Sequence, residues 1–321
     1  MRHFCTLFDS NYFDRGLVLY ESLRDKCAEF HLYIVPFDEE ALRQLTALQL
    51  PHVTLIPLPE FENPDLLRVK PGRTRGEYCW TSTPYLIDYV LTRFGVPQCT
   101  YLDADLCFYG DPGVLLDEMG DRSILITEHR YTPEYDQSAT SGIYCVQFLS
   151  IRNTPDGRTA LSWWRDRCLE WCYARMEDGK FGDQKYLDDW TTRFAGVHVL
   201  QHPGGGVAPW NVQRFPVNRE DNGTWHVSGR DPLIFYHFHH VKFLPEDRVD
   251  FSPYRHTEEG VFSLYADYLR RLERVWERTS FSPRRQSPDT SWRGRLWTLR
   301  RKWNGTYNVY DRKEFLRRWP G

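Results

Sequence analysis

Tyr101-Leu-Asp-Ala-Asp105 is the stretch around which this chain of 321 residues is organised. It has the pattern of a buried strand that begins near Cys99 and runs into the turn sequence Leu106-Cys-Phe-Tyr-Gly-Asp-Pro112. Two carboxylates separated by a single residue at a strand end can both reach one divalent cation. Mg²⁺ and Mn²⁺ prefer oxygen ligands and commonly complete their coordination with substrate phosphates. Asp is also common in ordinary turns, so the two aspartates could simply form a turn. The rest of the chain has to decide between a metal site and a turn.

The composition is that of a folded, mildly acidic protein. Hydrophobic residues make up 41% of the chain, enough to bury a sizeable core in one large domain or one domain with an appendage. The formal net charge of -3 predicts no general affinity for nucleic acid.

Charge is unevenly distributed along the chain. Residues 281–321 carry eleven Arg or Lys and three Asp or Glu, a net charge of +8, so the preceding 280 residues carry -11. An acidic body with a basic tail follows from this asymmetry. We therefore expect a main domain over residues 1–250 and a helical, basic and aromatic extension over residues 251–321.

No apolar run approaches the length of a membrane span, and the N-terminal residues meet a charge too early for a signal peptide. The eight cysteines show no pairing pattern, and Cys168 and Cys172 lack further ligands at metal spacing, which favours packing roles. These features predict a cytoplasmic protein.

The first hundred residues alternate between strand and helix patterns. Strands are expected at 3–8, 30–35 and 53–58, with helices at 14–26 and from residue 38. This order predicts an α/β fold with a mixed, mostly parallel sheet and helices on both faces. Ligands of such sheets bind at the carboxyl ends of the strands, where Asp103 and Asp105 also lie.

The loop after the first strand contains Phe8, Asp9, Asn11 and Tyr12, an aromatic and polar set suited to a nucleoside. Capping of the following helix is the alternative role for its polar residues. Arg73 and Arg75 precede a helix expected to run from about Thr83 to Phe94, and guanidinium groups pair well with phosphate oxygens. They could equally be solvated loop residues.

Further polar side chains follow later strands and helices. Glu128 and His129 end a strand over 124–127, and a long strand is expected over 141–151, followed by a helix from 158 to about 176. Asp183 and Gln184 stand ahead of a predicted helix over 185–190. Further on, the chain places Trp210 and Asn211 at the end of a glycine-rich loop, and His237, His239, His240 and Lys242 at the end of an apolar strand.

The order of these motifs resembles that of nucleotide-sugar glycosyltransferases of the GT-A fold, and is most similar to glycosyltransferase family 8. The resemblance covers roughly residues 1–245. It implies a Rossmann-like GT-A domain and a metal-dependent hexosyltransferase, in which a sugar moves with retention from a nucleotide-diphosphate donor, UDP-sugar above all, to a glycan or lipid-linked acceptor.

The resemblance also implies roles for individual residues. Asp103, Asp105 and His237 would bind Mn²⁺ or Mg²⁺, and Asp183 and Gln184 would be the catalytic pair at the donor sugar. The expected nucleotide-sugar contacts are Phe8, Asp9, Asn11, Tyr12, Arg75, Asp103, Ala104 and Lys242. The candidate acceptor or sugar contacts are Glu128, His129, Trp210, Asn211 and His239.

Two departures from the family pattern concern the donor sugar. The C-terminal motif His-x-x-Gly-x-x-Lys-Pro-Trp is replaced by His237-Phe-His-His-Val-Lys242-Phe-Leu, and the Asn-x-Gly strand entry is replaced by Ser141-Gly142. Sugar identity and stereochemistry are open at this point. A base such as Asp183 or Glu128 below the sugar would give inversion, and proton transfer to the departing phosphate would give retention. A nucleotidyltransferase and a catalytically inactive carbohydrate- or nucleotide-binding protein are the alternatives.

The C-terminal extension has its own pattern. A helix is expected over 260–278, and from Trp292 to Trp319 arginines alternate with aromatic residues. Basic aromatic segments bind anionic membrane surfaces, with roughly 1 kcal/mol from each basic residue near the surface. This predicts a peripheral protein at the inner face of the cell membrane; the alternative is a cationic tail packed against the acidic body.

Overall fold

The computed structural model describes residues 1–320 and contains a seven-stranded central sheet of order β3-β2-β1-β4-β7-β6-β8. Strands β3, β2, β1 and β4 are parallel, and only β7 runs against its neighbours β4 and β6. The prediction of a mostly parallel sheet is confirmed. The strands are β1 (Arg2–Phe8), β2 (Phe30–Pro36), β3 (Val53–Leu55), β4 (Gln98–Leu102), β6 (Ile124–Glu128), β7 (Tyr144–Arg152) and β8 (Val197–Val199).

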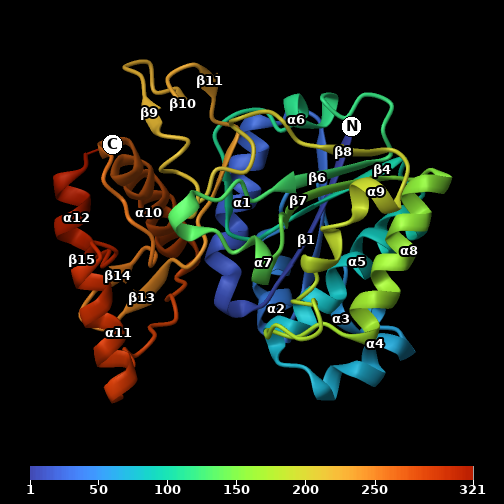
Figure 1. Cartoon of the computed structure of the whole chain (residues 1–321), viewed down its shortest axis with the longest axis horizontal. Coiled ribbons are helices and arrows are strands. Elements are labelled where there is room, and N and C mark those ends of the chain that lie inside the picture. Colours follow the sequence, from blue (N-terminus) through green and yellow to red (C-terminus); the bar gives the residue numbers. More distant parts are fainter. Residues whose placement is uncertain (321) are drawn as a thin grey trace.

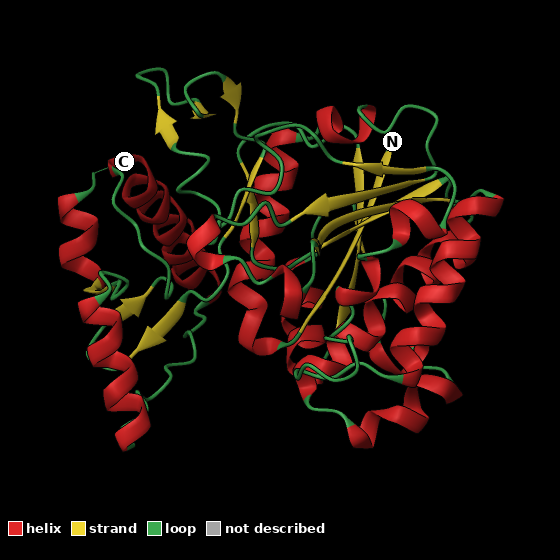
Figure 2. Ribbon diagram, viewed as in Figure 1, coloured by secondary structure: helices red, strands yellow, loops and turns green. Residues whose placement is uncertain are grey.

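Both faces of this sheet are covered by helices (Figure 2). Successive side chains of a strand point to opposite faces, so Phe4 joins one apolar core and Cys5 the other. Helices α1 (Phe13–Lys26) and α10 (Glu259–Thr279) pack in the first core, and α5 (Arg75–Arg93) and α8 (Pro155–Glu170) in the second. Burial on both faces explains the near-continuous apolar runs of the strands.

Local capping sets where several helices start. Thr74 and Glu77 form a capping box at the start of α5, and Asp38 accepts from the backbone of Ala41 at the start of α2 (Glu39–Leu48). Gly16 of α1 is required by a close approach, because a Cβ there would lie 2.3 Å from the ring of Phe8. The end of β1 is thereby packed directly onto the helix that follows it.

A short two-stranded sheet links the middle and the end of the main domain. Strand β5 (Leu106–Phe108) pairs antiparallel with β12 (Phe235–His237), in a register that sets Leu106 opposite His237. The backbone N–H of Phe238 also donates to the carbonyl of Asp105 over 2.9 Å. This pairing holds the end of β12 against the aspartate turn.

The remaining elements of the main domain are short. A three-stranded antiparallel sheet of β9 (Val217–Arg219), β10 (Trp225–Val227) and β11 (Asp231–Pro232) projects beside α10 (Figure 1). The short helices are α3 (Leu58–Phe61), α4 (Pro64–Val69), α6 (Gly113–Asp117), α7 (Ser138–Ser141) and α9 (Trp190–Arg193), with 3₁₀ turns at Ser10–Tyr12, Lys70–Gly72, Pro133–Tyr135 and Lys185–Leu187.

The C-terminal elements gather on one side of the molecule (Figure 1). Helix α10, expected from the sequence, packs on α1, and β13 (Lys242–Leu244), β14 (Arg248–Asp250) and β15 (Val309–Asp311) form an antiparallel sheet. Helices α11 (Trp292–Trp303) and α12 (Arg312–Arg318) complete this part. Strand β14 lies before the predicted domain boundary at residue 250 and β15 lies after it, so their pairing joins the extension to the main domain by a sheet. That the extension is a separate domain stays a prediction.

Several predicted limits differ from the observed ones. Helix α5 begins at Arg75 and contains Pro84, because the Thr74 cap starts it nine residues before that proline. Helix α8 ends at Glu170, and β7 begins at Tyr144, after α7 and Gly142 with its φ of 106°. The helix expected at 185–190 is a 3₁₀ turn followed by α9. Among residues 1–320, no helix is long and apolar enough to cross a membrane.

Candidate functional site

A cavity of about 770 Å³ opens at the carboxyl ends of β1 and β4. Fifteen of the predicted site residues line it, from segments that are far apart in the chain. They are Phe8, Asp9, Asn11, Tyr12, Arg75, Asp103, Ala104, Asp105, His129, Asp183, Gln184, Trp210, His237, His239 and Lys242.

Two aspartates and a histidine converge in this cavity. Nε2 of His237 lies 3.0 Å from Oδ1 of Asp105 and 3.8 Å from Oδ2 of Asp103. Both aspartates sit in the turn between β4 and β5, and His237 ends β12, which pairs with β5. The strand pairing therefore closes a cluster whose members are more than 130 residues apart in sequence.

Burial and mutual charge shift the titration of this cluster. Burial opposes ionisation of Asp105, but the charge and hydrogen bond of His237 outweigh it and lower the pKa of Asp105 to about 2. Burial, helped by the charge of Asp105, raises the pKa of Asp103 to about 6. Burial would lower the pKa of His237, yet Asp105 holds it well above its ordinary value. The cluster thus stabilises a positive charge at its centre.

Gln147, which we did not single out in the sequence, orients His237. Its Oε1 lies 2.7 Å from Nδ1 of His237, and the side chain is fully buried in β7. Since an amide oxygen can only accept, Nδ1 carries the proton, and the lone pair of a neutral ring is then on Nε2, facing the aspartates. The signal available in the sequence was a lone amide within the apolar run of β7.

The donor set of this cluster fits a divalent cation. Carboxylate oxygens of Asp103 and Asp105 with the imidazole of His237 suit Mn²⁺ and Mg²⁺, with the nitrogen ligand favouring Mn²⁺. His239 can offer a further nitrogen, since its ring, Asp105 and His237 present ligand atoms within 4.8 Å of one another. The ligand atoms of Asp103, Cys145 and His237 likewise lie within 4.8 Å of one another.

The loop after β1 is stabilised by its own polar residues. Asp9 accepts from the backbone N–H of Asn11 at 2.9 Å and from its side chain at 3.0 Å, so the capping alternative holds for Asp9. Nη1 of Arg75 lies 2.9 Å from Asp9, and Nη2 lies 3.2 Å from Asp38. The charge of Arg75 is thereby balanced by two carboxylates.

Asp183 and Gln184 also line the cavity. Asp183 is only 5% exposed, and burial, followed by the charge of Asp103, raises the pKa of its carboxyl to about 8. Gln184 donates to the carbonyl of Ser141 over 2.7 Å. The backbone carbonyl of Asp183 accepts from the indole of Trp164, which fixes the segment on α8.

An aromatic wall lines another side of the cavity. The rings of His129 and Tyr131 stack with centroids 4.6 Å apart, and Trp210 packs edge-on against His129 at 5.4 Å. The indole N–H of Trp210 donates to the carbonyl of His129, which holds the wall together. Tyr131 and Tyr254, which also lines the cavity, were not singled out in the sequence.

Three of the candidates lie away from the cavity. Glu128 does not line it, because it belongs to β6 and precedes the turn at His129. Asn211 is fully buried, and its side chain is satisfied by the backbone of His129, Gly206 and Ala208.

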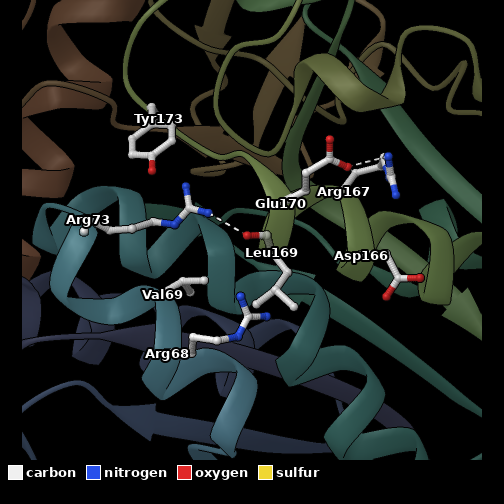
Figure 3. Close-up of a pocket in the computed structure, with 9 residues that line it drawn as sticks. Arg68, Val69, Arg73, Asp166, Arg167, Leu169, Glu170 and Tyr173 are labelled. Atoms are coloured by element: carbon white, nitrogen blue, oxygen red, sulfur yellow. Dashed lines mark hydrogen bonds and ion pairs between the residues drawn. The ribbon is translucent and has the colours of Figure 1, made fainter.

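Arg73 is the third, because its guanidinium donates to the carbonyls of Cys168, Leu169 and Cys172 at the end of α8. Figure 3 shows it beside Tyr173 and Leu169 in a separate, open pocket. Arg167 and Glu170 form an ion pair in the same pocket. A role for Arg73 at a phosphate in the main cavity is therefore contradicted by its contacts.

The C-terminal extension reaches the main cavity. Arg284 and Gln286, in the segment that joins α10 to α11, are among its lining residues. Nothing in their local sequence distinguished them from the other basic and polar residues of the tail.

The chain is 30% identical over 306 residues to the uncharacterised protein YfnD of Bacillus subtilis (strain 168), covering 90% of this chain and 97% of that protein. It is 32% identical over 243 residues to the uncharacterised protein YfnF of the same organism, covering 73% and 80%. No protein-family model matches the chain.

Among solved structures, the galactosyltransferase LgtC in complex with donor and acceptor sugar analogues matches with a TM-score of 0.50 and 16% identity, over 73% of this chain and 86% of that one. The fold is that of GT-A glycosyltransferases.

Proposed function

The chain belongs to the family of YfnD and YfnF of Bacillus subtilis, and we propose that it is a glycosyltransferase that moves a sugar from a nucleoside-diphosphate donor to a hydroxyl acceptor. The observation that carries this proposal is the convergence of Asp103, Asp105 and His237 in the cavity of a GT-A fold. Such a cluster suits a cation that is bound together with a diphosphate.

Asp103, Asp105 and His237 would hold Mn²⁺ or Mg²⁺, with Gln147 keeping the ring nitrogen of His237 available. A cation at this position neutralises negative charge on the departing diphosphate. Lys242 lines the same cavity and has no carboxylate within 4.0 Å in the described part of the chain, so it adds a fixed positive charge.

The nucleoside would lie in the part of the cavity formed by the loop after β1. Phe8 and Tyr12 offer aromatic surface, and Asp9 and Asn11 offer hydrogen-bonding groups for a base and ribose. Ala104, in the turn between the two aspartates, can contribute its backbone. We propose a UDP-sugar as the donor, with Arg75 leaving Asp9 and Asp38 to pair with the diphosphate.

The donor sugar would lie between the cation and the wall formed by Asp183 and Gln184. With a pKa of about 8, Asp183 is mostly protonated near neutral pH and is a poor general base, so it can donate a hydrogen bond to a sugar hydroxyl instead. Asp9, another carboxyl of the cavity, accepts hydrogen bonds from Asn11 in the loop that we assign to the nucleoside, away from the proposed position of the sugar. Inversion by a general base is therefore disfavoured, and we propose a hexosyl transfer with retention in which the departing phosphate oxygen takes the acceptor proton.

The acceptor would approach along the aromatic wall of His129, Tyr131 and Trp210. Aromatic faces pack well against the apolar faces of sugar rings, and the neighbouring imidazole of His239 can hydrogen-bond to hydroxyl groups. We propose a glycan or a lipid-linked glycan as the acceptor, which would place the enzyme in polysaccharide biosynthesis.

A membrane surface as a partner is supported by the outer face of α11. The most exposed apolar side chains of this helix recur at i, i+4, i+7 and i+11 and form one stripe. The stripe consists of Trp292, Leu296, Leu299 and Trp303, which are 69%, 59%, 63% and 91% exposed.

The residues flanking and opposing this stripe support the same orientation. Basic residues border it on both sides, Arg293 and Arg300 on one and Arg295 and Lys302 on the other. On the opposite face, Arg301 is buried in an ion pair with Asp250, which directs the stripe outward. We propose that the protein is cytoplasmic and binds the inner face of the cell membrane through this helix.

Titration calorimetry tests the donor class. UDP, GDP, CDP and dTDP are titrated into the protein with Mn²⁺ and with EDTA. One diphosphate binding only in the presence of Mn²⁺, followed by turnover of its sugar conjugates, is the expected result. Absence of binding by all four diphosphates overturns the proposal and favours an inactive carbohydrate-binding protein. In a separate assay with nucleoside triphosphates, release of pyrophosphate would instead indicate a nucleotidyltransferase.

A further inference from the structure

The segment that joins α10 to α11, residues 281–291, contributes Arg284 and Gln286 to the lining of the main cavity, and we call it the strap. At its start, the ring of Phe281 packs on Phe13 of α1 with centroids 5.3 Å apart. Further along, the backbone N–H of Gln286 donates to the carbonyl of Phe243 over 2.8 Å. The strap is therefore attached to the main domain on both sides of Arg284.

The strap runs beside β13 in a strand-like register. An isolated parallel bridge pairs Arg285 with Phe243, so Arg284 lies next to Lys242. Arg284 and Gln286 line the cavity, whereas Arg285 points away and lies 3.8 Å from Asp247. This alternation is that of an extended strand, and it brings the side chains of Arg284 and Lys242 to the same cavity.

Four Arg or Lys side chains line the cavity, and two of them are already paired with carboxylates. Arg15 pairs with Asp14 at 3.1 Å, and Arg75 pairs with Asp9 and Asp38. Within residues 1–320, neither Lys242 nor Arg284 has a carboxylate within 4.0 Å. Arg284 has one long hydrogen bond, 3.5 Å, to the side chain of Asn11. Two adjacent cations without counter-charges make a site for an anion.

We infer that Arg284 is part of the donor site, where it binds the diphosphate together with Lys242. The inference rests on the proposed function and deepens it, because it assigns part of the diphosphate site to the C-terminal extension. A guanidinium can offer two parallel N–H donors to phosphate oxygens, which an ammonium group such as that of Lys242 cannot. Asn11 at 3.5 Å places Arg284 at the nucleoside end of the diphosphate.

The structure offers a matched control for this inference. Arg285 has the same charge and the adjacent position in the strap but faces Asp247 outside the cavity. We would compare Arg284→Gln and Arg285→Gln in the full-length protein by calorimetry with Mn²⁺. The probes are the nucleoside diphosphate that the wild type binds best among UDP, GDP, CDP and dTDP, and the corresponding nucleoside.

For Arg284→Gln we expect about a tenfold weaker affinity for the diphosphate, the loss typical of one charge-assisted hydrogen bond, and an unchanged affinity for the nucleoside. Arg285→Gln should retain wild-type affinity for both. A thermal melt equal to that of the wild type shows that each variant is folded, and Arg284→Lys should recover part of the affinity.

The outcomes separate this inference from the function on which it rests. If the wild type binds none of the diphosphates, the proposed function fails, and the inference falls with it. If the wild type binds but the Gln variants of Arg284 and Arg285 behave alike, the function stands and the role of Arg284 is refuted. An equal loss of nucleoside and diphosphate affinity in Arg284→Gln would mean contact with the nucleoside alone, which also overturns the assignment.

Discussion

Nε2 of His237 lies 3.0 Å from Oδ1 of Asp105 although the two residues are far apart in sequence. The contact exists because β12 pairs with β5 and the backbone of Phe238 bonds to the carbonyl of Asp105. Without a cation, a proton on His237 satisfies the two carboxylates, which is why its pKa is raised. With a cation, the same three side chains become ligands.

Asp105→Asn is expected to abolish the binding of Mn²⁺. The change removes the anionic oxygen nearest to His237 and leaves a neutral amide in its place. Binding is measured as the loss of the free Mn²⁺ signal in electron paramagnetic resonance. The control is Asp111→Asn, because Asp111 pairs with Arg2 and does not line the cavity. Equal affinities of the two variants and the wild type would contradict the assignment of the metal site.

Gln147→Leu is expected to weaken Mn²⁺ binding by about 10- to 100-fold, the usual effect of losing the hydrogen-bond partner of a histidine ligand. In the variant, Nδ1 of His237 has lost its acceptor, so the proton is no longer held on Nδ1 and Nε2 is no longer kept free to bind the cation. Gln147→Glu keeps an acceptor oxygen at this position and should restore most of the affinity. If both variants bind Mn²⁺ as the wild type does, Gln147 has only a packing role.

Asp183→Asn is expected to stabilise the metal-free protein increasingly as the pH rises. The folded pKa of Asp183 is about 8, above the unfolded value of about 3.9. The stability that this raised pKa contributes to the folded wild type is therefore fully present below pH 4 and is lost as the pH rises toward 8. Asparagine does not titrate, so the difference in the free energy of unfolding between variant and wild type should grow by up to about 1.4 kcal/mol per pH unit in this window. Denaturant unfolding in EDTA at several pH values measures it, and a pH-independent difference would show that Asp183 is ionised throughout.

Asp250→Asn is expected to destabilise the protein by about 3–5 kcal/mol. Asp250 and Arg301 are 7% and 6% exposed, and two hydrogen bonds of 2.6 Å and 2.7 Å join them, so the change leaves an uncompensated buried guanidinium. Since this pair fastens α11 to β14, limited proteolysis should cut the variant first around residues 281–308. Uniform loss of structure would instead indicate that the extension and the main domain unfold as one unit.

Replacing Trp292 and Trp303 together by Ser is expected to abolish binding to vesicles that contain phosphatidylglycerol. Both residues belong to the exposed stripe of α11, and the variant removes its two aromatic side chains, which are the largest apolar groups of the stripe. Trp297→Ser is the matched control, because Trp297 is 52% exposed on the same helix but lies off the stripe. Binding is measured by vesicle sedimentation at low and high salt, and equal binding by all three proteins would refute the membrane surface.

The sequence was sufficient for the elements whose pattern is local. The strands around Phe4, Leu32 and Tyr101 were readable because each is a short apolar run between turn signals, and their alternation with helices predicted the parallel sheet. The position of Asp103 and Asp105 at a strand end followed in the same way. Helix limits were less accurate, as at Arg75, where a capping box outweighed the expected effect of Pro84.

The sequence by itself determined the α/β class, the strand ends that carry the carboxylates, and the basic, aromatic character of the tail, since these depend on the periodicity and composition of neighbouring residues. Only the tertiary structure decided that His237 and Gln147 meet the aspartates, that Arg73 caps α8, and that Arg284 enters the cavity. Pairing between distant segments depends on how their side chains pack across the sheet and the strap, and no local pattern encodes that register.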